Sequence, residues 1–217
     1  MDDAARIRNR LVDRMIVAGI GIDRGVEAAL RAVPRHAFLP EVSIDAAYAD
    51  GVVAIKSANG VALSTASQPT MIALMLEQLR VEPGMRVLEI GTGSGYNAAL
   101  LAELAGAYGR VVTIDIEADL AANAARRLYA TGYGSVRIIC GDGRNGDPHD
   151  APFDRIIVTA SAPSIAPSLF EQLREGGRLV APIGNSAAQR SIAYERTVAG
   201  LRETGAIACQ FIPLRSQ

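Results

Sequence analysis

The stretch Val87–Tyr96, VLEIGTGSGY, carries the strongest structural signal in the chain, because a short apolar run ends in an acid and is followed by three glycines. Gly91, Gly93 and Gly95 lack Cβ atoms, so the backbone can turn sharply and come close to a ligand. A helix that starts after such a turn offers free N–H groups to an anion. We therefore interpret the stretch as a strand, a binding loop and a helix start; the alternative is a tight turn that binds nothing.

Strand-like and helix-like runs alternate on the C-terminal side of this stretch. The pattern predicts strands at 86–90, 110–115, 136–140, 154–160 and 178–183, and helices at 96–106, 117–131 and 164–174. Strands separated by helices of this length form βαβ units, in which helices cover both faces of a parallel sheet. Two last strand-like runs, QRSIAYERTV and GAIACQFIPL, have no helix between them. We expect a doubly wound, mostly parallel sheet that ends in an antiparallel edge hairpin.

The N-terminal part of the chain is less regular. Apolar spacing predicts helices at 2–18 and 23–32, whereas KSANGVALSTAS, residues 56–67, is interpreted as an irregular loop. Ser67 is a plausible N-cap for the helix that follows, with Pro69 close behind it. This part therefore predicts N-terminal helices and an exposed loop placed before the sheet.

Composition limits the kind of protein. A chain of 217 residues with 49% hydrophobic content suits one domain, 1–217, in which an N-terminal helical and substrate-loop portion (1–80) precedes an α/β core (81–217). The net charge of −1 and the absence of a basic run argue against nucleic acid. Cys140 and Cys209 lack CxxC spacing, so we expect neither a disulfide nor a metal site. With no long apolar window, the chain is expected to be cytoplasmic and to have no membrane partner. We also expect a monomer.

Acids and glycines recur at the ends of successive predicted strands, where doubly wound sheets bind ligands. Asp115 closes the second strand, where a carboxylate can accept hydrogen bonds from both hydroxyls of a ribose. Asp142 follows the third strand and can reach an adenine amino group, with Gly143 allowing close approach. A helix cap at Asp115 and a plain Asp-Gly turn are the alternatives. Together these positions predict a nucleoside site, with the methionine end of S-adenosylmethionine over the glycine loop.

The chain resembles the protein-L-isoaspartate (D-aspartate) O-methyltransferase family over nearly its whole length, in VPRHAFLPE, AYAD, ASQPTMIALMLEQL, VLEIGTGSGYNAALLAEL, GDGRNGD, APFDRIIVTA, LREGGRLVAPIG and FIPL. The resemblance implies a class I, Rossmann-like α/β fold and the cofactor S-adenosyl-L-methionine. It also implies methyl esterification of an L-isoaspartyl or aspartyl carboxylate in a polypeptide, giving an ester that can collapse to a succinimide. By the family pattern, Ser67 contacts the acceptor carboxylate, and the cofactor site comprises Glu89, Gly91, Thr92, Gly93, Gly95, Asp115, Ile116, Asp142 and Gly143.

One segment departs from the family pattern. Family members that repair isoaspartate usually carry a compact GQTIS segment, whereas this chain has SANGVALSTAS, with Ala66 in place of the isoleucine. The longer segment, together with RSIAYER, is similar to a branch of the family that methylates an aspartate in ribosomally made precursor peptides. Protein repair and peptide modification therefore both stay open, and residues 56–66 are expected to close over the peptide.

The chemistry of the predicted reaction fits the scarcity of bases. A carboxylate with a pKa of about 4 is already an anion at neutral pH, so methyl transfer to it needs no general base. His36 is expected to be structural, and His149 lies in the polar turn GDPHDAP and is expected to face water. Ser67 would orient the acceptor and not activate it, because alignment alone can contribute about 7–11 kcal/mol.

Three other functions are compatible with parts of the pattern. A nicotinamide-dependent oxidoreductase would share the sheet, the glycine turn and the ribose acid, although G-x-G-x-G differs from its G-x-G-x-x-G spacing. A small-molecule O-methyltransferase acting on a hydroxyl would need a base such as His36. A cofactor-binding module without activity is the third.

Overall fold

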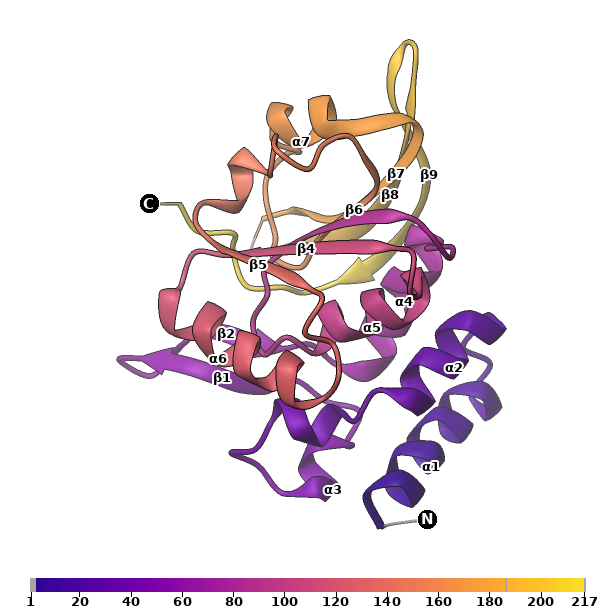
Figure 1. Cartoon of the computed structure of the whole chain (residues 1–217), viewed down its shortest axis with the longest axis vertical. Helices are drawn as coiled ribbons and strands as arrows, with labels where there is room; N and C mark the ends of the chain where they lie inside the picture. The colour runs from indigo at the N-terminus through magenta and orange to yellow at the C-terminus, as the bar shows by residue number, and fades with distance from the viewer. Residues whose placement is uncertain (1–2, 186, 217) are drawn as a thin grey trace.

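A seven-stranded sheet forms the centre of the molecule in the computed structural model, which describes residues 3–185 and 187–216 (Figure 1). Its strands lie in the order β5-β4-β3-β6-β7-β8-β9. They are β3 (Arg86–Ile90), β4 (Arg110–Asp115), β5 (Arg137–Cys140), β6 (Phe153–Val158), β7 (Leu173–Gly184), β8 (Gln189–Thr197) and β9 (Gly200–Cys209). Strands β3 to β7 pair in parallel, whereas β8 pairs antiparallel with both β7 and β9. The predicted doubly wound sheet with an antiparallel edge hairpin is confirmed.

The order of the strands reverses at β3, which has β4 on one side and β6 on the other. Ligands of open α/β sheets bind beyond the carboxyl ends of the strands at such a reversal. The reversal therefore places the loop after β3 at the expected binding edge.

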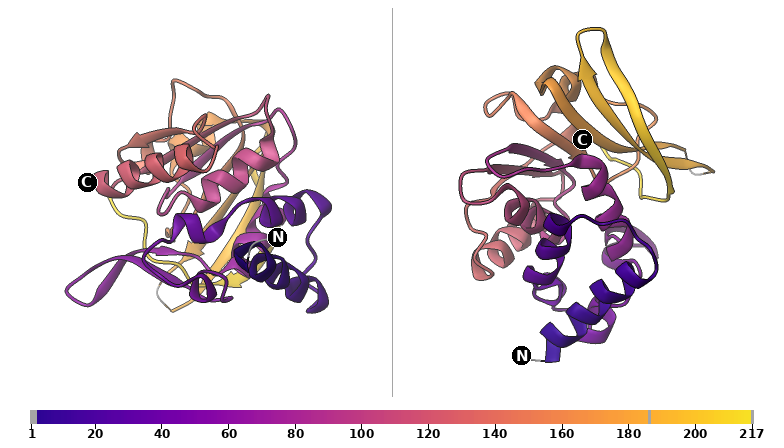
Figure 2. Two further views of the ribbon diagram at one scale, coloured as in Figure 1. Left: turned by 60° about the horizontal axis from the view of Figure 1, so that its bottom comes forward. Right: turned by 90° about the vertical axis from the view of Figure 1, so that its right-hand side faces the viewer.

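Helices cover both faces of the sheet, as Figure 2 shows from two sides. The helices are α1 (Asp3–Val17), α2 (Arg24–Ala32), α3 (Ile44–Ala47), α4 (Pro69–Leu79), α5 (Tyr96–Ala105), α6 (Ala118–Ala130) and α7 (Pro167–Gln172), with short 3₁₀ turns at Arg35–Phe38 and Gly143–Asn145. Val87 of β3 packs in the core that contains α1, α2, α4 and α5, whereas its neighbour Leu88 packs in the core that contains α7. Consecutive residues of a strand point to opposite faces, so Val87, Leu88 and Ile90 show no apolar alternation because both faces of β3 are buried.

The prediction of an irregular loop at 56–67 is wrong. Strands β1 (Val53–Ala58) and β2 (Val61–Ala66) form an antiparallel hairpin there. The turn residues Asn59 and Gly60 have φ values of 52° and 75°, which suit the tight Asn-Gly turns that join twisted strands. The Asn-Gly pair was a usable signal, but the two strands lack the regular apolar alternation of a half-buried strand.

The lengths of α7 and β7 also differ from the prediction. The helix covers 167–172 and not 164–174, while the strand starts at 173 and not 178. Pro167 suits the first turn of a helix, and Leu173 pairs with Phe153 of β6, so the chain enters the sheet earlier than periodicity indicated.

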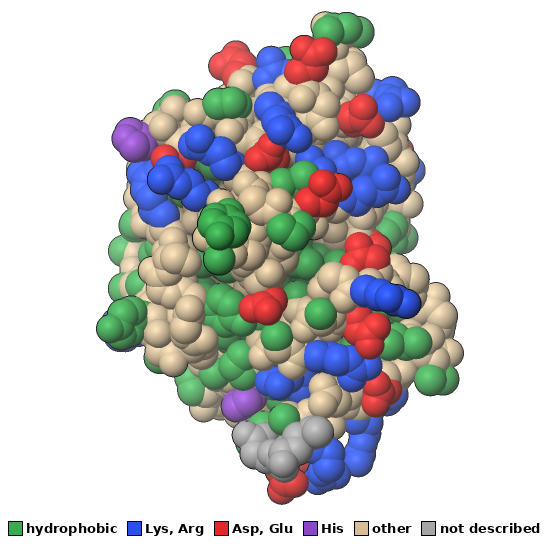
Figure 3. All heavy atoms as spheres, turned by 45° about the vertical axis from the view of Figure 1, so that its right-hand side comes forward, with side chains coloured by type: hydrophobic (Ala, Val, Ile, Leu, Met, Phe, Trp, Pro, Cys, Tyr) green, Lys and Arg blue, Asp and Glu red, His purple; other side chains and the backbone are tan. Residues whose placement is uncertain are grey.

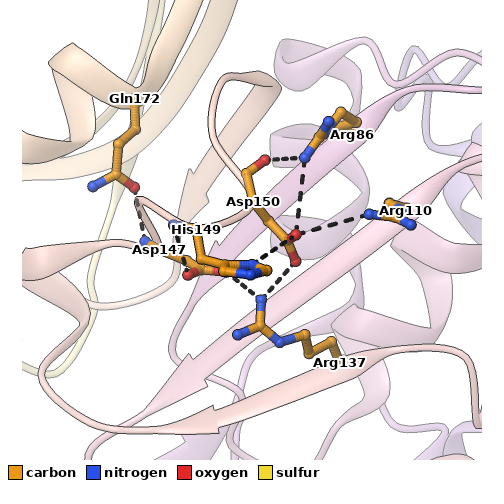
Figure 4. Close-up of polar contacts among 7 residues, drawn as sticks. All are labelled: Arg86, Arg110, Arg137, Asp147, His149, Asp150 and Gln172. Atoms are coloured by element: carbon orange, nitrogen blue, oxygen red, sulfur yellow. Dashed lines mark hydrogen bonds and ion pairs between the residues drawn. The ribbon is translucent and has the colours of Figure 1, made fainter.

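The amino ends of three strands meet at Asp150, on the edge of the sheet opposite the carboxyl ends (Figure 4). Its carboxylate lies 2.6 Å from Arg137 Nη1 at the start of β5 and 3.8 Å from Arg110 Nη1 at the start of β4. Arg86, at the start of β3, donates to the Asp150 carbonyl. His149 beside it is 82% exposed, as expected from its polar turn. This cluster therefore ties neighbouring strands together far from the glycine loop.

The surface shows no strong sorting of charge on the face drawn in Figure 3, where acidic and basic side chains are interspersed. Cys140 and Cys209 are free thiols. Across the described residues, every helix is too short or too polar to span a bilayer.

Candidate active site

The glycine loop joins β3 to α5 through backbone that only glycine adopts readily. Gly91, Gly93 and Gly95 have φ values of 101°, 53° and 89°. A Cβ atom on Gly91 would lie 2.3 Å from the Thr159 hydroxyl oxygen, which donates to the carbonyl oxygen of Gly91 at 2.9 Å. The predicted sharp turn is confirmed, and the loop leaves no room for a side chain between β3 and β6.

Asp115 links the glycine loop to the turn after β4. One carboxylate oxygen accepts from the Gly93 N–H at 2.8 Å, and the other accepts from the Glu117 N–H at 3.0 Å. Only 8% of Asp115 is exposed, and each oxygen still has acceptor capacity. The N-cap of α6 is Glu117, so Asp115 is not that helix cap. Its carboxylate is fixed at the edge where a ligand would arrive.

Asp142 and Gly143 form the third turn of this edge. The Asp142 carboxylate accepts from the backbone N–H of Arg144 at 3.0 Å and pairs with its guanidinium at 2.6 Å, so the Asp-Gly turn is present as the alternative anticipated. A Cβ atom on Gly143 would lie 2.3 Å from Ile90 Cγ2, which means that only glycine allows this turn to approach β3.

Three adjoining hollows lie along this edge. The rim cavity, about 550 Å³ including space open to solvent, lies between β2, the ends of β3 and β4, and the C-terminal segment 212–215. The loop cavity, about 460 Å³ on the same basis, lies between the glycine loop, α4 and Arg35. The outer groove, about 1720 Å³, runs between 65–71, 161–163 and 208–214. Thr65 lines all three hollows, while Ser67 and Phe211 line both the loop cavity and the outer groove. The three hollows are therefore neighbours that share walls.

The predicted site residues divide between these hollows. Those that line the rim cavity are Gly91, Gly93, Asp115, Ile116 and Gly143, whereas Thr92 lines the loop cavity and Ser67 lies at its junction with the groove. Glu89, Gly95 and Asp142 are not among the residues lining these three hollows. Their roles as cofactor contacts stay predictions.

Glu89 lies behind the glycine loop and is completely buried. Its carboxylate accepts from Asn97 Nδ2 at 2.7 Å and from the Thr113 hydroxyl at 2.6 Å, and Thr113 is hydrogen-bonded in turn to the Thr92 hydroxyl at 2.7 Å. Burial raises the pKa of Glu89 to about 7, although both hydrogen bonds favour the ionised form. Glu89 thus positions Thr92 and Asn97, which line the loop cavity.

The prediction that Ser67 caps α4 is wrong. The N-cap is Gln68, and the free backbone N–H of Thr70 is satisfied at 2.9 Å by Asp50, which also accepts from the Thr70 hydroxyl at 2.8 Å. Because a remote carboxylate takes over the capping, the Ser67 hydroxyl makes no hydrogen bond within residues 3–185 and 187–216. It remains available at the junction of the loop cavity and the groove.

Arg35 was not identified from the sequence. It is fully buried, stacks 5.0 Å from the Tyr96 ring centre and donates to the carbonyl oxygens of Ala47 at 2.8 Å and Ser67 at 2.9 Å. Its Nη1 has no partner among the described residues, and burial lowers the pKa of the guanidinium. A buried cation lining the loop cavity is unusual unless an anion approaches it. Arg35 lies in VPRHAFLPE, one of the segments that carry the family resemblance, but the segment by itself did not mark this arginine as a site residue.

His36 is held elsewhere. Its Nδ1 lies 2.8 Å from the Tyr48 hydroxyl, and it is absent from the walls of the rim cavity, the loop cavity and the outer groove. This placement fits the expected structural role.

Comparisons with known proteins show the family of this chain. A family model described as protein-L-isoaspartate(D-aspartate) O-methyltransferase matches residues 6–217. A protein-L-isoaspartate O-methyltransferase of Methanopyrus kandleri is 43% identical over 96% of this chain and 91% of that relative, and one of Methanoregula boonei is 46% identical over 95% and 92%. A solved protein-L-isoaspartate O-methyltransferase superposes with a TM-score of 0.87 at 32% identity, covering 95% of this chain and 65% of the other. A Plasmodium falciparum structure in complex with S-adenosyl-L-homocysteine, 24% identical over 97% and 99% of the two chains, shows the same fold with a TM-score of 0.83. The chain belongs to the protein-L-isoaspartate (D-aspartate) O-methyltransferase family.

Proposed function

We infer that this protein transfers a methyl group from S-adenosylmethionine to the carboxylate of an L-isoaspartyl residue in a polypeptide. The family match and the identity to its members support this activity and cofactor. The observation that carries the inference within the molecule is that the rim cavity, the loop cavity and the outer groove share a wall at Thr65, and that Ser67 lines both the loop cavity and the groove. The oxidoreductase and small-molecule alternatives are no longer needed.

The residues of the rim fit the adenosine part of the cofactor. A Cβ atom on Gly91 or Gly143 would lie 2.3 Å from Thr159 or Ile90, so each turn packs closely against its neighbour and its bare backbone forms part of the cavity wall. The fixed carboxylate of Asp115 can accept from ribose hydroxyls, and Ile114, Ile116 and Leu214 offer apolar walls to a planar base. When bound, S-adenosylmethionine supplies a methyl group attached to a positively charged sulfur. We propose that the glycine loop holds its methionine portion in the loop cavity.

The residues at the junction fit an acceptor carboxylate. We propose that the Ser67 hydroxyl donates a hydrogen bond to the acceptor, and that Arg35 supplies positive charge nearby through its unpartnered Nη1. The acceptor is already an anion, so these groups orient it and do not remove a proton. The apolar side chains of Met71 and Phe211 border the groove, where they would displace water from a bound peptide.

The test uses labelled S-adenosylmethionine with an isoaspartyl peptide and its normal aspartyl counterpart. Label on the isoaspartyl peptide is expected, whereas transfer to the aspartyl peptide alone would favour modification of a precursor peptide. Label on neither would contradict the assignment of the groove.

A Ser67→Ala variant tests the junction. Loss of one hydrogen bond to a charged group is expected to lower kcat/KM about 10- to 150-fold. Ser135→Ala, an exposed serine at the opposite edge of the sheet, is the matched control and should retain activity. Equal activity of the two variants would remove Ser67 from the proposal.

We further propose that the enzyme acts as a monomer, because all three hollows are formed within one chain. Sedimentation at working concentrations checks this.

A further inference from the structure

Two segments from outside the parallel strands cover the rim cavity, and both are tied to Glu117. From the β1–β2 hairpin, Lys56 Nζ pairs with one carboxylate oxygen of Glu117 and, at 2.6 Å, with Asp119. From the C-terminal segment, Arg215 Nη1 pairs with the other oxygen of Glu117 at 2.6 Å. Figures 1 and 2 show the hairpin, the C-terminal segment and the start of α6 on the same side of the molecule. One carboxylate therefore joins two segments that are far apart in the sequence.

The position of these ion pairs connects them to the cavity. The hairpin contributes Leu63 and Thr65 to its wall, the C-terminal segment contributes Leu214 and Arg215, and Ile116 precedes Glu117 directly. Asp115 at the base is only 8% exposed. The hairpin and the C-terminal segment therefore both border the space in front of this carboxylate.

The strength of the pairs suits opening and closing. Lys56 is 26% exposed, Glu117 21% and Arg215 36%, so water and salt reach all three. Partly exposed pairs of this kind are weak and are screened by salt. Glu117 itself is fixed independently, because it begins α6, where a negative charge is also favoured by the helix dipole. The two cations can therefore leave while Glu117 stays in place.

We propose that Glu117 is a positioning residue that latches the β1–β2 hairpin and the C-terminal segment over the bound cofactor through Lys56 and Arg215, and that breaking these ion pairs sets the rate of cofactor exchange. The proposal rests on the proposed function only in placing the adenosine portion in the rim cavity. The latch acts on the walls of the cavity and not on the transferred methyl group.

The test measures release of S-adenosylhomocysteine by stopped-flow competition. Loss of two partly exposed pairs in Glu117→Gln is expected to speed release about 2- to 30-fold at low salt. The wild-type rate should rise toward that of the variant at about 1 M salt, where the screening length falls to about 3 Å. Lys56→Gln should give part of the effect, and Lys56→Arg, which keeps the charge, should restore slow release.

The control is Glu203→Gln, which removes an ion pair with Arg190 on β8–β9, away from the cavity. Its release rate should match the wild type. The wild type could bind S-adenosylhomocysteine and release it quickly, at a rate that depends on neither Glu117 nor salt. That result would overturn the latch and leave the proposed function standing. Absence of binding in the wild type, measured first by calorimetry, would overturn both.

Discussion

Replacement of Glu89 by Gln tests the most unusual electrostatic feature of the site, a fully buried carboxyl group whose pKa burial raises to about 7. The local hydrogen bonds can survive the change. The amide oxygen would accept from Asn97, and the amide nitrogen would donate to Thr113, whose hydroxyl would then donate to Thr92. The substitution therefore removes the charge and little else.

The size of the expected change in the free energy of unfolding follows from the linkage between protonation and folding. A pKa of about 7 in the folded state, against an ordinary value of 4.5 for a glutamate side chain, is a difference of about 2.5 pH units, or about 3 kcal/mol as an upper bound. Because the folded pKa is the higher one, the folded protein keeps a proton between about pH 4.5 and pH 7 that the unfolded chain has lost. This contribution to stability is complete below pH 4.5 and is lost as the pH rises to about 7.

The assay is urea unfolding of the wild type and Glu89→Gln from pH 5 to pH 8. The variant should gain stability relative to the wild type as the pH rises, by up to about 3 kcal/mol, with an unchanged m-value. In Glu175→Gln, which alters an exposed carboxylate, the free energy of unfolding should change with pH as it does in the wild type. The same pH dependence in Glu89→Gln would refute the reasoning, because Glu89 would then not change its protonation state across this range.

Three further changes have defined outcomes. Asp115→Asn should weaken S-adenosylhomocysteine binding about 10- to 150-fold by calorimetry, because an amide cannot accept through both of its terminal atoms. Gly91→Ala places a Cβ atom 2.3 Å from Thr159 Oγ1 at a φ of 101°, and should lower the free energy of unfolding by about 1–3 kcal/mol in a urea titration. Arg137 holds the pKa of the Asp150 carboxyl below its usual range. Asp150→Asn removes this ion pair and should lower the thermal midpoint at pH 7. The difference in midpoint from the wild type should shrink as the pH falls below about 4, where the wild-type carboxylate becomes protonated.

Sequence reasoning located the elements whose signals are local. The glycine loop and the acid at the end of β4 were predicted because strand, turn and helix signals follow one another within 87–115. The hairpin of β1 and β2 was missed, although Asn59 and Gly60 give a turn signal, because β1 has no buried residue and the buried residues of β2, Ser64 and Ala66, are small or polar and give no apolar alternation. Its β2 strand instead borders a cavity, and cavity walls do not follow the alternation of a packed sheet.

Other features depend on contacts between distant segments. Nothing near Arg35 in the sequence shows that it is buried against Tyr96, 61 residues away, or that one of its nitrogens lacks a partner among the described residues. In the same way, Ser67 looked like a helix cap until the structure placed Asp50 at the start of α4. Such roles depend on which side chains lie close together in the folded chain. Local sequence preferences do not specify those contacts.

The arrangement of the three hollows constrains how the enzyme's specificity can change. The β1–β2 hairpin carries the departure from the family's usual segment, yet it contributes Thr65 to the rim cavity, the loop cavity and the outer groove alike. A change in the hairpin that reshapes the groove for another acceptor must therefore also move a wall of the cofactor cavities. Ser161 shares this coupling, because its backbone bonds to Ile212 and Leu214, which line the rim cavity. Ala162 and Pro163 line the groove and neither of the other hollows, and the backbone of Ala162 bonds to Pro182 and Gly184 instead. Acceptor preference should consequently respond to 162–163 with little change in cofactor affinity, whereas changes at 63–66 should alter both.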